Sequence, residues 1–132
     1  MALDSQQTGS TTILVLGTKA SMGIVDALFE LGFEPIIRSR TEGLLRKLRR
    51  ERSEAVVVDA ENCSDDLLEF LLNVRDIDQR TPVIVLGDAS GAGVEDDLLT
   101  VRQAFILGRF ADTDELAHKL KRVIRIPEME DG

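Results

Sequence analysis

Short runs of apolar residues recur along the chain, and each is followed by a segment with apolar residues at helical spacing. The runs cover residues 12–16, 34–38, 55–58, 82–86 and 105–107. Most are apolar at consecutive positions, which is typical of strands buried on both faces of a parallel sheet. The intervening segments carry apolar residues three and four apart and predict helices over about 24–31, 41–48, 65–74, 94–101 and 112–124.

Residues that favour helix ends help to place the helices. Thr41 is a candidate N-cap for the second helix, and Ser64 or Asp65 for the third. Asp112 and Glu115 have the spacing of a capping box at the start of the last helix. That helix is expected to continue until Pro127, because proline cannot extend a helix.

Five alternating strand–helix units predict an α/β fold with a doubly wound, five-stranded parallel sheet in the flavodoxin-like order 2-1-3-4-5. We expect one domain over residues 11–126, a flexible N-terminus over 1–10, and a flexible tail or the start of a linker over 127–132. In this fold, functional residues gather at the carboxyl ends of the strands. Here those ends are Gly17 and Thr18, Asp59, Gly87 and Asp88, and the segment 107–110.

Composition narrows the function classes. The 132 residues carry a net charge of −8, which argues against nucleic acid or an anionic membrane as the main partner. One cysteine and one histidine exclude an internal disulfide and any site built from several cysteines or histidines. No apolar run approaches the roughly 20 residues of a membrane span, and no signal peptide is evident. We therefore expect a cytoplasmic location.

The charges are unevenly distributed. Residues 38–52 contain seven basic and two acidic residues, and the rest of the chain is strongly acidic. This basic segment is either a solvated helix face or a docking surface for an acidic partner, which includes another copy of the chain.

Three segments resemble the receiver domain of bacterial response regulators. They are EAVVVDAEN (54–62), TPVIVLGDAS (81–90) and DTDEL (112–116). The resemblance implies phosphoryl transfer to an aspartate at the end of the third strand. It also implies an acidic pair after the first strand that holds Mg²⁺, a hydroxyl residue ending the fourth strand, and a lysine after the fifth.

Asp59 matches the phosphoacceptor position, and the other positions differ. Gly17 and Thr18 stand where the acidic pair belongs, Gly87 where the hydroxyl belongs, and Gly108 or Arg109 where the lysine belongs. These replacements predict a pseudo-receiver in which Asp59 is inactive. The resemblance is particularly to the degenerate receivers that begin some sigma-54-dependent transcriptional activators.

We therefore interpret the chain as a non-enzymatic signalling module that acts through protein contacts, with no cofactor, in a two-component or transcriptional regulator. We also expect a weak homodimer, and Arg102, Arg109, Lys119 and Arg122 are its candidate contact residues. We expect its partner to be a protein, such as a fused or neighbouring effector domain, rather than nucleic acid or a membrane.

Two alternatives use the same strand ends. One is a phosphorylatable receiver, in which Asp59 works with Mg²⁺. The other is a flavodoxin-like domain that binds a small ligand or an anion at the loop 17–23, where a helix begins.

Overall fold

A computed structural model describes residues 11–62, 66–87 and 104–124 of the chain. It contains a five-stranded parallel sheet in the order β2-β1-β3-β4-β5, as predicted. The strands are β1 (Thr12–Leu16), β2 (Glu34–Arg38), β3 (Ala55–Asp59), β4 (Val83–Leu86) and β5 (Ala104–Gly108). The helices are η1 (Lys19–Ser21), α2 (Met22–Glu30), α3 (Thr41–Arg50), η2 (Ala60–Asn62), α4 (Leu67–Ile77) and α6 (Thr113–Leu120).

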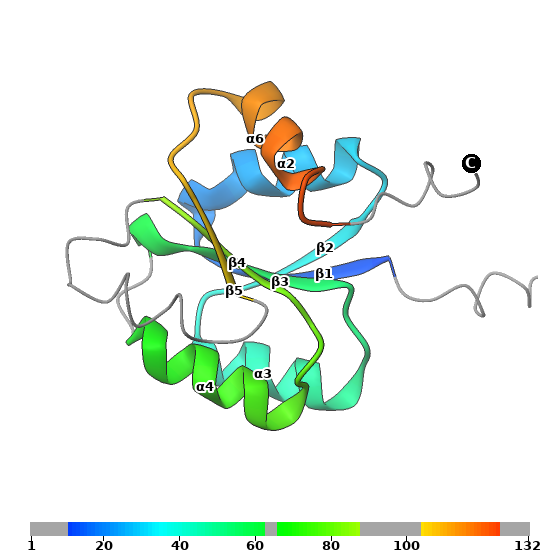
Figure 1. Cartoon of the computed structure of the whole chain (residues 1–132), viewed down its shortest axis with the longest axis vertical. Helices are drawn as coiled ribbons and strands as arrows, with labels where there is room; N and C mark the ends of the chain where they lie inside the picture. Colours follow the sequence, from blue (N-terminus) through cyan, green and yellow to red (C-terminus); the bar gives the residue numbers. More distant parts are fainter. Residues whose placement is uncertain (1–10, 63–65, 88–103, 125–132) are drawn as a thin grey trace, which may run out of the picture.

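Helices cover both faces of the sheet, with α2 and α6 on one face and α3 and α4 on the other (Figure 1). The central strands β1, β3 and β4 are buried almost throughout, which explains their consecutive apolar residues. Alternate side chains enter two separate cores. Val57 packs on the α2 and α6 side, and its neighbours Val56 and Val58 pack on the α3 and α4 side.

The edge strand β2 is protected against pairing with another strand. The Glu34 N–H donates to the Thr11 carbonyl just before β1, and the Arg38 carbonyl accepts from the Gly17 N–H just after it, so the backbone groups of Pro35 and Ile37 point away from the sheet. Pro35 has no N–H to offer, and the Arg38 guanidinium donates to the Ile37 carbonyl (2.9 Å). Such features limit edge-to-edge association.

The predicted helix ends are only partly correct. Asp112 is the N-cap of α6, as expected, and accepts from the Glu115 N–H. Thr41 is the first helical residue of α3 rather than its cap. The N-cap is Arg40, which is the last residue with an extended backbone before the helix. Asp66, not Ser64 or Asp65, caps α4. The regular part of α6 ends at Leu120, before the Pro127 that was expected to stop it, and turns follow to residue 124.

Several predictions fall outside the described ranges. They are the helix over 94–101, Ser64, Asp65, Asp88, Arg102 and the two chain ends. Within the described ranges, no helix is both long and apolar enough to span a membrane.

Candidate functional site

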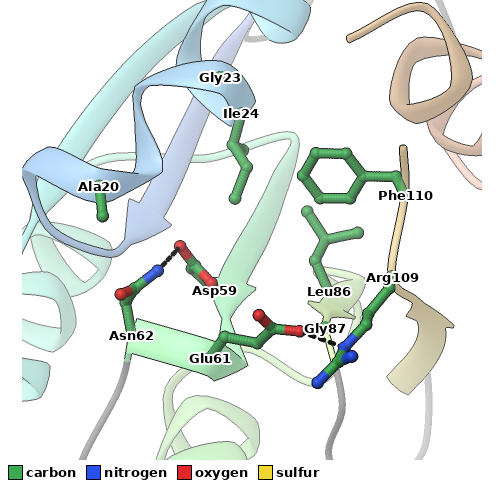
Figure 2. A pocket seen from close by; sticks show the side chains of 10 residues that line it. All are labelled: Ala20, Gly23, Ile24, Asp59, Glu61, Asn62, Leu86, Gly87, Arg109 and Phe110. Atoms are coloured by element: carbon green, nitrogen blue, oxygen red, sulfur yellow. Dashed lines mark hydrogen bonds and ion pairs between the residues drawn. The ribbon is translucent and has the colours of Figure 1, made fainter. Parts of the chain in front are cut away.

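A cleft of about 380 Å³ opens at the carboxyl ends of the strands, where the topology predicted function. One wall is polar, and Ile24, Leu86 and Phe110 form an apolar wall opposite it (Figure 2). The remaining lining residues are Ala20, Gly23, Asp59, Glu61, Asn62, Gly87 and Arg109.

Asp59 ends β3 and is held by two side chains of the same protein. The Ser21 hydroxyl donates to Asp59 Oδ2 (2.6 Å), and Asn62 Nδ2 donates to the same oxygen (2.8 Å). Ser21 is 1% exposed and Asp59 is 7% exposed, so the first hydrogen bond is buried. A buried carboxylate needs such donors because burial otherwise penalises it strongly. Ser21 and Asn62 therefore stabilise Asp59 at the cleft wall.

The loop after β1 is built around Ser21. Thr18 caps η1 by accepting from the Ala20 N–H, and the Thr18 N–H donates to Ser21 Oγ (3.0 Å). Gly17 leaves room for this arrangement, because a Cβ there would lie only 2.3 Å from Ser21 Oγ. The N–H groups of Gly17 and Ser21 are also used, by the Arg38 and Thr18 carbonyls. Four N–H groups of the predicted anion loop are thus committed to the fold.

Gly87 stands at the turn after β4, where the receiver pattern has a hydroxyl residue. Its φ of +100° lies in the region that favours glycine. A Cβ at Gly87 would lie 2.7 Å from Glu61 Cγ. The missing side chain therefore gives Glu61 space to cross the end of β4.

Glu61 reaches the segment after β5. Arg109 Nε donates to Glu61 Oε2 (2.6 Å), and the pair joins the loop after β3 to the loop after β5 (Figure 2). The side chains are 70% and 43% exposed for Arg109 and Glu61, so the pair contributes only about 0–1 kcal/mol. The pair matters because it connects the segment after β3 to the segment after β5.

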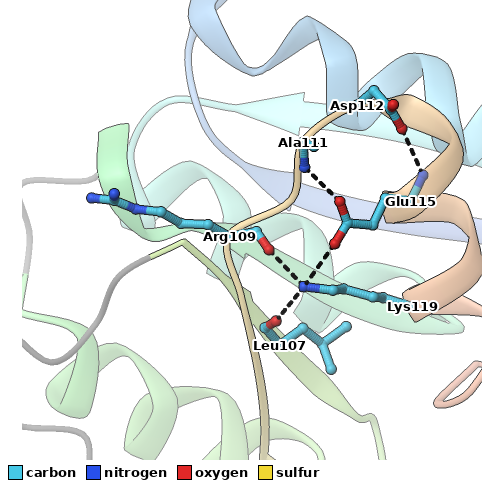
Figure 3. Close-up of polar contacts among 6 residues, drawn as sticks. All are labelled: Leu107, Arg109, Ala111, Asp112, Glu115 and Lys119. Carbon is cyan, nitrogen blue, oxygen red and sulfur yellow. Dashed lines mark hydrogen bonds and ion pairs between the residues drawn. The ribbon is translucent and has the colours of Figure 1, made fainter.

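Lys119 of α6 fixes the backbone that carries Arg109. Its ammonium donates to the carbonyls of Arg109 (2.6 Å) and Leu107 (3.1 Å), and lies 3.7 Å from Glu115 Oε2 (Figure 3). Glu115 Oε1 also accepts from the Ala111 N–H (2.8 Å). The left-handed φ of +73° at Gly108 turns the chain into this segment. Arg109 is thereby presented beside the cleft.

The structure thus brings together Asp59, Gly17, Gly87 and Arg109, four of the residues predicted to form a site. Lys119 supports the same site from α6, although the sequence suggested it only as a dimer contact. Ser21 belongs to the loop 17–23, which was the alternative candidate for an anion site, and its hydroxyl donates to Asp59. The spacing of Thr18 and Ser21, which is that of a capping box, was the available signal for their pairing.

The cleft residues do not fit the Mg²⁺ site that the receiver pattern implies. Mg²⁺ prefers about six oxygen ligands in near-octahedral geometry. Gly17 and Thr18 supply no carboxylate, and Ser21 occupies the space beside Gly17. Within residues 11–62, 66–87 and 104–124, no three aspartate, glutamate, histidine or cysteine side chains form a group that could hold a metal.

No protein-family model matches the chain. No curated protein matches its sequence either. Any relationship must therefore be judged from the fold.

Solved structures of receiver domains are similar over most of the chain. Chemotaxis protein CheY4 of Vibrio cholerae is 18% identical, with a TM-score of 0.72 over 87% of this chain and 99% of CheY4. The receiver domain of a sensor histidine kinase from Pseudomonas aeruginosa, with magnesium in its active-site cleft, is 19% identical, with a TM-score of 0.69 over 87% and 98% of the two chains. TrrA of Thermotoga maritima, solved with Mg²⁺ and BeF, is 23% identical, with a TM-score of 0.67 over 85% and 97%. The chain therefore has the fold of CheY-like response-regulator receiver domains.

Proposed function

We propose that this protein is a receiver-like regulatory module that works through protein contacts and without phosphorylation of Asp59. The observation that carries the proposal is the double hydrogen bond from Ser21 and Asn62 to one oxygen of Asp59. The nucleophile of a phosphoryl transfer must reach the phosphorus atom while a cation neutralises the phosphoryl oxygens. In this cleft, Asp59 Oδ2 already accepts two donors, and the described residues around it contain no group of three acidic, histidine or cysteine side chains that could hold a metal.

The ion pair between Glu61 and Arg109 supports the same proposal. In a receiver, the new phosphate draws the loop after the fourth strand inward and contacts the lysine after the fifth. Here the carboxylate of Glu61 passes Gly87 and binds Arg109 directly. We infer that this pair links the segment after β3 to the loop after β5 without any phosphate, in place of a contact that depends on phosphate.

Treatment with a small phosphodonor tests the proposal. The whole chain is incubated with Mg²⁺ and acetyl phosphate, quenched in the cold because acyl phosphates hydrolyse, and weighed intact. A receiver domain that accepts phosphoryl groups serves as the positive control and Asp59→Asn as the negative control. We expect no phosphoryl group on the wild-type chain. A mass increase of one phosphoryl group that Asp59→Asn abolishes would overturn the proposal.

A phosphorylatable receiver is the second candidate function, because Asp59 ends β3 and lines the cleft. The same measurement decides between the two. We also expect Asp59→Asn to leave the protein's biological output largely intact. If a folded Asp59→Asn protein lost that output, the second candidate would be favoured.

A further inference from the structure

The outer face of α3 carries three exposed arginines, Arg46, Arg49 and Arg50. No other described residue forms an ion pair or hydrogen bond with any of these three side chains. By contrast, Lys47 on the same helix pairs with Glu51 (2.8 Å). In a chain with 24 acidic and 16 basic residues, a group of arginines left unpaired in this way needs an explanation.

Folding explains these arginines only in part. Arg49 and Arg50 lie in the last turn of α3, where the helix dipole favours cations. The dipole therefore explains part of their contribution to the stability of the fold. However, Arg46 is three residues from Arg49 and four from Arg50, so like charges adjoin on the helix surface and repel one another. A single glutamate at one of these three positions would remove the repulsion, yet all three residues are arginine.

The face is suited to recognition by charge alone. All three leucines of α3, Leu44, Leu45 and Leu48, are buried against the sheet, so they offer no apolar contact to a partner. Guanidinium groups bind carboxylates through two parallel hydrogen bonds. A carboxylate-rich surface is therefore a chemically matched partner.

The surroundings limit the length of that partner. Helix α3 has ten residues and is about 15 Å long. Helix α4 lies beside it on the same face of the sheet (Figure 1), and its exposed residues include Glu69 and Asp76. A long polyanion such as duplex nucleic acid would extend past α3 towards these carboxylates. A short acidic segment can end before them.

We propose that the outer face of α3 is a docking surface for a short, carboxylate-rich protein segment that binds Arg46, Arg49 and Arg50. A second copy of this chain is a less suitable occupant, because basic α3 against an acidic surface elsewhere is a head-to-tail contact that does not close. Exposed ion pairs are individually weak and screened by salt. The complex therefore forms and dissociates rapidly, and its affinity falls as the salt concentration rises. None of the three arginines lines the cleft, and the proposal does not depend on the proposed function.

Binding of a labelled peptide tests this surface. The probe is a fluorescein-labelled peptide of alternating glutamate and serine, titrated with the whole chain at low salt and followed by anisotropy. The test variant is Arg46→Gln with Arg49→Gln and Arg50→Gln. The control variant, Lys19→Gln with Arg80→Gln and Lys121→Gln, removes the same charge from exposed residues elsewhere. Circular dichroism and urea unfolding verify that both variants remain folded.

We expect the test variant to weaken peptide binding about tenfold, which corresponds to about three weak ion pairs, and the control variant to change it much less. Equal losses in the two variants would overturn the proposal, because net charge alone would then explain binding. Tighter binding of a DNA single strand of equal charge, lost in the test variant, would assign the surface to nucleic acid instead. Undetectable peptide binding at low salt, or self-association that only the test variant abolishes, would also overturn it.

Discussion

At the scale of single residues, glycine has two separate roles beside the cleft. Gly17 and Gly87 both leave space for a polar side chain that binds another residue, Ser21 in one case and Glu61 in the other. Gly87 additionally has a positive φ, which other residues adopt only with strain. At these two positions, which both depart from the receiver pattern, the space is therefore filled by the protein's own side chains.

Replacing Gly87 by alanine should destabilise the fold. The positive φ costs about 1–3 kcal/mol, and the new Cβ would also displace Glu61. Urea unfolding measures the change. Adding Glu61→Ala should recover only the part that is due to crowding.

Gly23→Ala is the matched control for this prediction. Nothing lies within 4 Å of a Cβ built there, and the residue is in helix α2, so alanine should be neutral or stabilising by up to about 1 kcal/mol. Equal stability of Gly87→Ala and the wild type would contradict the role assigned to Gly87.

Sequence reasoning identified the residues of the site better than their contacts. Asp59, Gly17, Gly87 and Arg109 were found because strand ends can be located from apolar runs. The partner of Arg109 could not be found, because Glu61 is 48 residues away and no local pattern links the two. Ser21 lies in the loop after β1, and its bond to Asp59 depends on how that loop folds over β3.

At the scale of elements, the turn between α4 and β4 is organised by Asp78. Its carboxylate accepts from Thr81 Oγ1 (2.7 Å) and from the Arg80 N–H (2.8 Å), and its carbonyl accepts from Arg75. Partial burial raises the pKa of Asp78, but the bonds from Thr81 and Arg80 and the charge of Arg75 outweigh it. The pKa is therefore held below its ordinary value.

This lowered pKa predicts a contribution to acid sensitivity. When the folded pKa lies below the unfolded value of about 3.9, the stabilisation is fully present above that value. It is lost as the pH falls from there through the folded pKa. Asp78→Asn should therefore be less stable than the wild type near neutral pH, and the difference should shrink below about pH 4.

Urea unfolding at several pH values measures this difference. Asp76→Asn, which removes the same charge from an exposed position two residues earlier, is the control. If the difference between Asp78→Asn and the wild type were the same at every pH, the assignment of a lowered pKa to Asp78 would be wrong.

Elements were predicted more reliably than their ends. Apolar runs located all five strands, and the pattern is strongest in β1, β3 and β4 because they are buried on both faces. Helix starts were less predictable. By residue type, any of Thr41, Ser64 and Asp65 could cap a helix. The caps are instead Arg40 and Asp66, because the path of the preceding strand or loop decides where each helix begins. Asp112 was correct because Glu115 follows at the spacing that makes the cap specific.

At the scale of the whole molecule, the two edges of the sheet differ. Both edge strands are half-buried, over Pro35, Ile36 and Ile37 in β2 and over the whole of β5, but only β2 has a proline and the Arg38 contact that oppose strand pairing. Phe105 packs partly on the α2 and α6 core, and Ile106 partly on the opposite core. The β5 side therefore has apolar surface left to contribute to an interface, and β2 is unsuited to strand pairing.

We predict a weak homodimer through the β5 and α6 side, with affinity that falls moderately with salt. Arg122 is exposed after α6 and can meet an acidic group of a partner copy, while Arg102 lies outside the described residues. Lys119 is less available, because its ammonium already binds the carbonyls of Leu107 and Arg109. Exposed ion pairs contribute about 0–1 kcal/mol each, so the apolar residues of β5 must supply much of the affinity.

Sedimentation of the whole chain at several concentrations and salt levels measures this association. Arg122→Glu should weaken the dimer through a lost contact and leave the free energy of unfolding nearly unchanged. Lys119→Glu should weaken the dimer and also lower the free energy of unfolding of the monomer. The reason is that the substitution releases the segment that carries Arg109. The α3 variant that replaces Arg46, Arg49 and Arg50 should dimerise as the wild type does. A strictly monomeric chain at high micromolar concentration and low salt would refute the prediction, and a dimer sensitive only to the α3 variant would move the interface to that helix.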